Sequence, residues 1–154
     1  TLTQQLAKNV FLTPDRTFKR KVQELLLAFW MEARLSKQEI MALYFNRVYF
    51  GAGAYGVQAA AQTYFARPAQ ELTLPEAAIL AGLLKAPSRY APTRDPEAAV
   101  LRARQVLKAM TQTGYLAQAQ ADNITFEALR VSRQNGASAH YAVDWALEQL
   151  PGFM

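Results

Sequence analysis

The sequence contains no cysteine, which excludes disulfides and thiolate metal sites. Its single histidine, His140, has no second histidine with which to build a metal site, so we expect it to be structural or incidental. No apolar run approaches the roughly 20 residues that a membrane-spanning helix needs. A signal peptide is also lacking and residue 1 is threonine, so we expect the chain to be a piece of a longer protein.

The bulk composition favours a folded domain. Of the 154 residues, 51% are hydrophobic and 19% are charged, which argues against wholesale disorder. A net charge of +5 and a pI near 9.6 favour an anionic partner. Nucleic acid, a phosphorylated substrate and a membrane surface all fit this charge, and charge alone does not distinguish them.

Apolar residues recur at helical spacing along the chain as far as about residue 121, which predicts an all-α fold without a substantial sheet. A wide apolar stripe between Phe18 and Ala33 predicts a buried helix, with Glu24 and the basic residues left on its other faces. Residues 1–10 have the pattern of a shorter helix. Beyond residue 121 the pattern weakens, and residues 130–139 are expected to form a linker before a short helix at 140–150.

Two capping boxes mark where further helices begin. Ser36 with Glu39, and Thr73 with Glu76, have the spacing in which each side chain satisfies the other's backbone N–H. The first of these helices is expected to turn Ile40, Leu43, Tyr44 and Val48 inward. The second has almost no polar face over residues 77–84, which predicts a central buried helix.

The glycine-rich segment 46–56 (NRVYFGAGAYG) is interpreted as a tight connection rather than a strand. Its glycines match neither the dinucleotide fingerprint nor the P-loop. A packed turn between helices is therefore favoured over a phosphate cradle.

Residues 16–24 (RTFKRKVQE) place four cations, Arg16, Lys19, Arg20 and Lys21, near the start of a helix. The start of a helix is the positive end of its macrodipole, so these cations cost about 0.3–1 kcal/mol each unless an anion binds there. Glu24 follows Arg20 by four residues and Lys21 by three. The alternative to an anion site is a solvated face with two ordinary intrahelical salt bridges.

Five segments carry family motifs, in this order: residues 1–5 (T-L-T-Q-Q) with L-A-K-N after them, 20–24 (R-K-x-x-E), 37–46 (K-Q-E-I-M-A-L-Y-F-N), 49–56 (Y-F-G-x-G-x-Y-G) and 102–107 (R-A-R-Q-V-L). Together they resemble the peptidoglycan glycosyltransferase domain, glycosyltransferase family 51, of class A penicillin-binding proteins and monofunctional transglycosylases. Ala103 interrupts the paired arginines of the last motif. The resemblance covers residues 1–121.

The resemblance implies a lysozyme-like helical domain that is incomplete at its N-terminus, at residues 1–121. Residues 122–154 would form an extension toward a possible transpeptidase domain. The family's motif E-D-x-x-F-x-x-H-x-G carries the glutamate taken as general base, and it does not occur in this chain. By resemblance, the parent protein joins lipid-linked disaccharides with inversion at the anomeric carbon, and this chain alone is expected to be inactive.

The resemblance also implies roles for individual residues. Glu24 matches the family's second essential glutamate, which orients nearby cations or helps to hold Mg²⁺ at a diphosphate. The residues expected to bind that diphosphate are Lys8, Arg16, Arg20 and Lys21. Cleft or framework contacts are expected from Thr3, Gln4, Gln5 and Asn46.

The implied partners are lipid II, nascent glycan chains and the outer face of the bacterial cytoplasmic membrane, with no role for nucleic acid. Two alternatives stay open from the sequence. One is a basic helical module that binds nucleic acid, although no recognisable helix-turn-helix or zinc pattern is present. The other is a degenerate, non-catalytic domain that interacts with a membrane surface.

Overall fold

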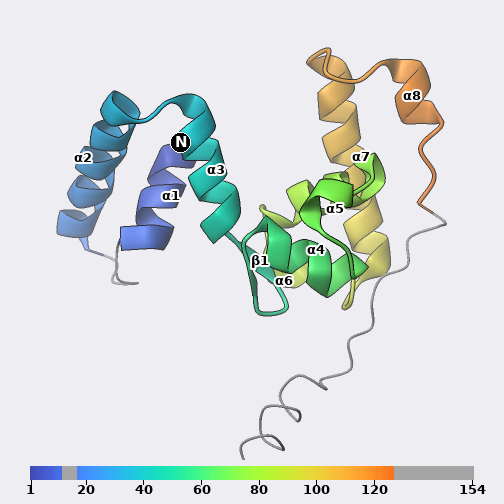
Figure 1. Cartoon of the computed structure of the whole chain (residues 1–154), viewed down its shortest axis with the longest axis horizontal. Coiled ribbons are helices and arrows are strands. Elements are labelled where there is room, and N and C mark those ends of the chain that lie inside the picture. The colour runs from blue at the N-terminus through green and yellow to red at the C-terminus, as the bar shows by residue number, and fades with distance from the viewer. Residues whose placement is uncertain (12–16, 127–154) are drawn as a thin grey trace, which may run out of the picture.

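The computed structural model describes residues 1–11 and 17–126. Figure 1 shows two groups of elements joined where the third helix ends. The first group is α1 (Leu2–Phe11), α2 (Phe18–Arg34) and α3 (Lys37–Arg47). The second comprises β1 (Tyr49–Gly51), β2 (Ala54–Tyr55), α4 (Val57–Phe65), the 3-10 turn η1 (Ala69–Glu71), α5 (Leu74–Leu83), α6 (Pro87–Tyr90), α7 (Pro96–Gln112) and α8 (Gln118–Asp122). The all-α prediction is confirmed.

In the first group α1 packs against both α2 and α3 (Figure 1). Leu6 and Ala7 of α1 are buried, as are Ile40 and Tyr44 of α3. The chain runs along α1, returns along α2 and reverses again along α3. As a result, the last turn of α1, the first turn of α2 and the last turn of α3 lie at the same end of this group.

The second group is built on α5, which packs most extensively against α7. Ile79, Leu80 and Leu83 of α5 are buried, which confirms the predicted central helix. Gly82 allows the close approach, because a Cβ there would lie 2.9 Å from Cγ of Arg102 on α7.

Both predicted capping boxes are present. Ser36 Oγ accepts from the backbone N–H of Glu39, whose carboxylate accepts from the Ser36 N–H at 2.8 Å. The Glu76 carboxylate accepts from the Thr73 N–H at 2.8 Å. These caps fix where α3 and α5 begin, and α3 in turn sets where the chain enters the second group.

The prediction that the apolar stripe of α2 is buried is wrong. Phe18, Leu26 and Phe29 are 86%, 65% and 74% exposed, and the other exposed members are Val22, Leu25 and Trp30. The buried residues of α2 are Glu24, Ala28 and Met31, a narrow strip that faces α1. Helical periodicity identifies an apolar face, but it does not say whether protein covers that face.

Two smaller expectations also fail. Leu43 was expected inside but is 42% exposed, because α3 turns Ile40, Tyr44 and Val48 toward the core instead. The connection at 46–56 contains two short antiparallel strands, β1 and β2, in which Tyr49 pairs with Tyr55 and Gly51 with Ala54. The two turn residues, Ala52 (φ 49°) and Gly53 (φ 76°), both have the positive φ angles that a hairpin this tight requires.

Several sequence expectations fall outside the described residues: Arg16, the linker at 130–139, the helix at 140–150 and His140. Within residues 1–11 and 17–126, none of the helices is both long and apolar enough to cross a membrane.

Candidate functional site

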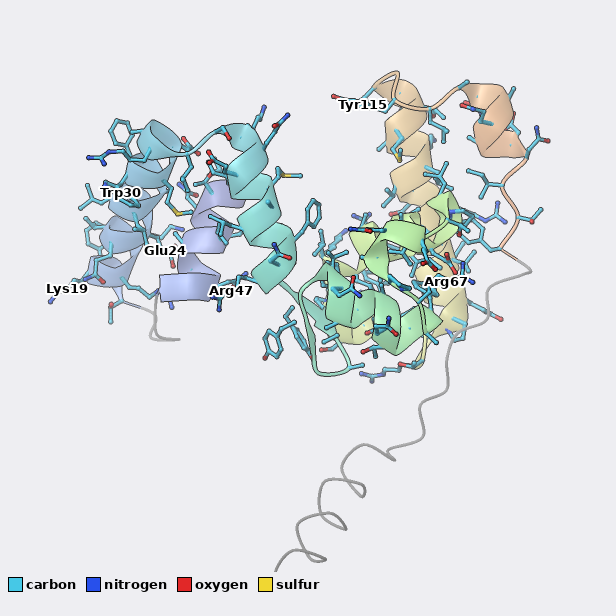
Figure 2. All side chains as sticks on the ribbon, viewed as in Figure 1. Lys19, Glu24, Trp30, Arg47, Arg67 and Tyr115 are labelled. Carbon is cyan, nitrogen blue, oxygen red and sulfur yellow. The ribbon has the colours of Figure 1, made fainter. Side chains whose placement is uncertain are left out.

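Three helix ends bring basic side chains to one end of the first group. Lys8 lies in the last turn of α1, Arg47 in the last turn of α3, and Lys19 to Lys21 in the first turn of α2. The C-terminal ends of α1 and α3 favour cations, whereas the start of α2 does not. Figure 2 labels Lys19, Glu24 and Arg47, which all lie toward this end of the group.

Glu24 lies next to three of these cations, Lys8, Arg20 and Lys21. Its side chain is only 3% exposed. Arg20 Nε lies 3.2 Å from Glu24 Oε1, and Lys21 Nζ donates to Glu24 Oε2 at 2.9 Å. The two intrahelical pairs of the solvated-face interpretation therefore exist, but they hold a buried carboxylate rather than an exposed one.

The environment of Glu24 keeps its carboxylate ionised. The hydrogen bond from Lys21 lowers the pKa of Glu24, and the charges of Lys21, Arg20 and Lys8 act in the same direction, against the opposing effect of burial. A general base for a neutral-pH reaction works best with a pKa near the operating pH. Glu24 therefore suits the positioning of cations better than proton transfer.

Four of the five cations remain accessible, whereas the Arg20 side chain is only 14% exposed. Lys21 is 65% exposed, and Lys8, Lys19 and Arg47 are also exposed. Glu24 is thus paired with Arg20 and Lys21 and feels the charge of Lys8. Lys19 and Arg47 are exposed at the same end of the group. We call these five basic side chains, Lys8, Lys19, Arg20, Lys21 and Arg47, the cation cluster. Such an arrangement can bind a group with two or more negative charges.

Three further residues with predicted roles, Thr3, Gln4 and Gln5, lie in the first half of α1. Thr3 is buried near the start of α1 and its hydroxyl donates to Glu32 Oε1 at 2.6 Å. Gln5 accepts from the Tyr44 hydroxyl at 3.2 Å, joining α1 to α3. Gln4 accepts from the N-terminal amine at 3.1 Å. Thr3 and Gln5 thus join α1 to α2 and α3, and Gln5 lies less than one helical turn before Lys8.

Asn46 has a different position. It is exposed in the last turn of α3, directly before Arg47. Its side chain is therefore open to a ligand next to the cation cluster, whereas its backbone approaches Gly56 closely.

The residues described here fit a resident magnesium ion poorly. Among them, no three His, Cys, Asp or Glu side chains gather in a group that could hold a metal. Both carboxylate oxygens of Glu24 are already contacted by cations. Mg²⁺ prefers oxygen ligands with near-octahedral geometry, and adjacent cations disfavour it. The role of Mg²⁺ stays a prediction, and we derive no step through it.

Arg47 is the residue of the cation cluster that the sequence did not reveal. It belongs to none of the charged motifs and follows the last motif position of α3, Asn46. A basic residue in the last turn of a helix is ordinary in itself. Arg47 joins the cation cluster only because α1 and α3 end at the same end of the first group.

Most of this chain is similar to known proteins. A family model described as "Transglycosylase" matches residues 1–111. Penicillin-binding protein 1A of Aquifex aeolicus is 50% identical over 135 residues, which cover 88% of this chain and 19% of that protein. Penicillin-binding protein 1A of Escherichia coli is 48% identical over 132 residues, covering 86% and 16%. The chain thus spans less than a fifth of the length of these relatives.

A solved structure supports the fold directly. The crystal structure of penicillin-binding protein 1A from Haemophilus influenzae matches 86% of this chain and 17% of its own, with 31% identity and a TM-score of 0.55. The lysozyme-like helical fold expected from the motifs is confirmed, and the nucleic-acid alternative gains no support. The boundary expected at residue 121 stays a prediction.

Proposed function

Because this chain belongs to the transglycosylase family, we propose that it forms the diphosphate-binding part of a peptidoglycan glycosyltransferase. In the proposed reaction, the sugar 4-hydroxyl of an acceptor attacks the anomeric carbon of a glycan carried on a polyprenyl diphosphate. The new glycosidic bond forms with inversion, and the diphosphate leaves with the electron pair of the broken bond. Lipid II and the growing glycan chain are the proposed substrates.

The observation that supports this proposal is the cation cluster around buried Glu24. Negative charge grows on the leaving diphosphate in the transition state, and fixed positive charge stabilises it. Glu24 contacts Arg20 and Lys21 directly and so orients both toward one place. Such preorganisation avoids moving the cations during the reaction. The proton of the attacking hydroxyl passes to a general base, a role that we assign to no residue of this chain.

A binding experiment tests this role. Vesicles containing a polyprenyl diphosphate should bind the chain more tightly than vesicles containing the monophosphate. Lys21→Ala should weaken the diphosphate-dependent affinity at least about tenfold, because a hydrogen bond to a charged group contributes about 1.5–3 kcal/mol. Lys108→Ala, on an exposed part of α7, is the matched control and should leave affinity unchanged. If both variants lose affinity equally, the cation cluster contributes only nonspecific positive charge and is not a diphosphate site.

The exposed apolar face of α2 supports a membrane surface as a second partner. Phe18, Leu25, Leu26, Phe29 and Trp30 are all more than half exposed. The guanidinium of Arg34 lies 5.9 Å from the Trp30 ring, and the basic first turn lies on the same helix. Apolar side chains beside cations are typical of helices that lie in a lipid interface. The proposed location is the outer face of the cytoplasmic membrane, and a transpeptidase domain in the longer protein stays a prediction.

Vesicle sedimentation tests the membrane proposal separately. Phe29→Asp should lower partitioning onto anionic vesicles at least about tenfold, because a buried phenylalanine contributes about 1.5–3 kcal/mol. Leu101→Asp is the control, since Leu101 is 64% exposed on α7. If both variants sediment like the unmodified chain, α2 does not contact lipid.

A further inference from the structure

The hairpin formed by β1 and β2 carries a pair of tyrosines whose rings are in contact. Tyr49 and Tyr55 are directly opposite each other across the two strands. Their ring centroids are 4.9 Å apart and the ring planes are inclined by 41°. Tyr55 is 67% exposed, whereas Tyr49 is half-buried and its hydroxyl accepts from the Gly53 N–H at 3.5 Å. Tyr49 therefore supports Tyr55, whose ring is largely open to solvent.

The hairpin is fixed against the second group. A Cβ on Gly51 would lie 2.9 Å from both the Pro87 carbonyl oxygen and the Tyr64 hydroxyl, so the backbone packs closely there. The buried Tyr64 hydroxyl donates to the Phe50 carbonyl at 3.0 Å. Burial, together with neighbouring Tyr49, raises the pKa of Tyr64 to about 12, so this donor keeps its proton. The tyrosine pair is therefore held in place before any ligand binds.

The pair adjoins polar groups at the end of α3. The Gly56 N–H donates to the Val48 carbonyl at 2.9 Å, which ties the hairpin to the residue that caps α3. Asn46 and Arg47, the two residues before that cap, are exposed. Figure 2 places Arg47 at the end of α3 that leads into the hairpin. Asn46 and Arg47, the latter a member of the cation cluster, are thus the exposed hydrogen-bonding side chains that directly precede the hairpin.

The chemistry of this surface favours a sugar over a lipid. The face of an aromatic ring is electronegative, so it attracts the polarised C–H groups on one face of a pyranose. Tyrosine also supplies a rigid contact area at a small entropy cost. A lipid contact would need neighbouring aliphatic side chains, but among the described residues the largest group of exposed apolar side chains lies on α2, and none of the hairpin's other residues is a large exposed hydrophobic one.

We propose that Tyr49 and Tyr55 form a stacking platform for a sugar ring of the glycan, with Asn46 and Arg47 donating to its polar substituents. This inference rests on the proposed function, because it adds one sugar contact to the proposed substrate-binding site. It requires the glycan to extend from the cation cluster across the end of α3 to the hairpin.

The test uses a probe that has neither lipid nor diphosphate, the β-1,4-linked tetrasaccharide of N-acetylglucosamine. Its affinity is measured by calorimetric or NMR titration of the chain. Tyr55→Ala should weaken binding about tenfold through loss of the ring face, whereas Tyr55→Phe keeps the ring and should stay within about twofold. Tyr115→Ala is the matched control, because Tyr115 is 84% exposed in the segment between α7 and α8 (Figure 2).

The outcomes separate this inference from the proposed function. Equal affinities of Tyr55→Ala and Tyr115→Ala, or no saturable binding of the tetrasaccharide at millimolar concentration, overturns the stacking platform. Saccharide binding that depends on Tyr55 supports it even if polyprenyl diphosphate vesicles fail to bind, a result that would instead refute the diphosphate site. Circular dichroism of each variant establishes that the helices are retained.

Discussion

Glu24→Gln is expected to abolish glycan polymerisation when it is introduced into a full-length transglycosylase that carries this segment. Glutamine keeps the shape of the side chain but removes the charge that holds Arg20 at 3.2 Å and Lys21 at 2.9 Å. Loss of one preorganised electrostatic contact typically lowers kcat about 100- to 1000-fold. The measurement is the rate of polymer formation from lipid-linked disaccharide.

The control for this substitution is Glu71→Gln. Glu71 is exposed in η1, and none of the salt bridges found within residues 1–11 and 17–126 includes it. Both variants should match the unmodified protein in helical content and unfolding temperature. A lower rate of polymer formation in Glu24→Gln alone then reports on the reaction and not on folding. Normal polymerisation by Glu24→Gln would remove Glu24 from the catalytic site.

Gly56→Ala is expected to destabilise the fold by about 3 kcal/mol, the largest stability effect we predict. Gly56 has φ +86° and ψ 154°, a backbone region that is essentially restricted to glycine. A Cβ there would also lie 2.6 Å from the Asn46 carbonyl oxygen, a backbone atom that cannot move without displacing the end of α3. Urea unfolding followed by circular dichroism measures the change in the free energy of unfolding.

Gly53→Ala isolates the two causes. Gly53 also has a positive φ, +76°, but a Cβ there would meet no atom within 4 Å. Its substitution should therefore cost only the conformational term, about 1 kcal/mol. If the two variants are equally stable, neither the close approach of Gly56 to α3 nor its glycine-only backbone region adds to the cost.

Much of the fold could be predicted because its signals are local. Ser36 with Glu39 and Thr73 with Glu76 marked two helix starts from spacing alone, and the structure has both capping boxes. The uninterrupted apolar character of α5 likewise predicted its burial. Each of these signals depends on residues within one or two turns, so no knowledge of distant contacts was needed.

The failures arise where the answer depends on another element. The sequence identified the apolar face of α2 correctly. However, α1 packs against a different strip of this helix, where Glu24, Ala28 and Met31 are buried. Arg47 joins the cation cluster only because α3 returns to the end where α2 begins. The sequence predicted the chemistry of Lys8, Arg20, Lys21 and Glu24 through the family motifs, and their roles still await the experiments above.

The exposed face of α2 has a consequence for how substrate would arrive. A helix that rests on a bilayer along one side lies with its axis in the plane of the lipid headgroups. Both ends of such a helix lie at the level of the headgroups. The first turn of α2, with Lys19, Arg20 and Lys21, would therefore lie at that level too. A lipid-linked diphosphate would therefore reach these cations by lateral diffusion within its own leaflet, without its hydrocarbon chain leaving the bilayer.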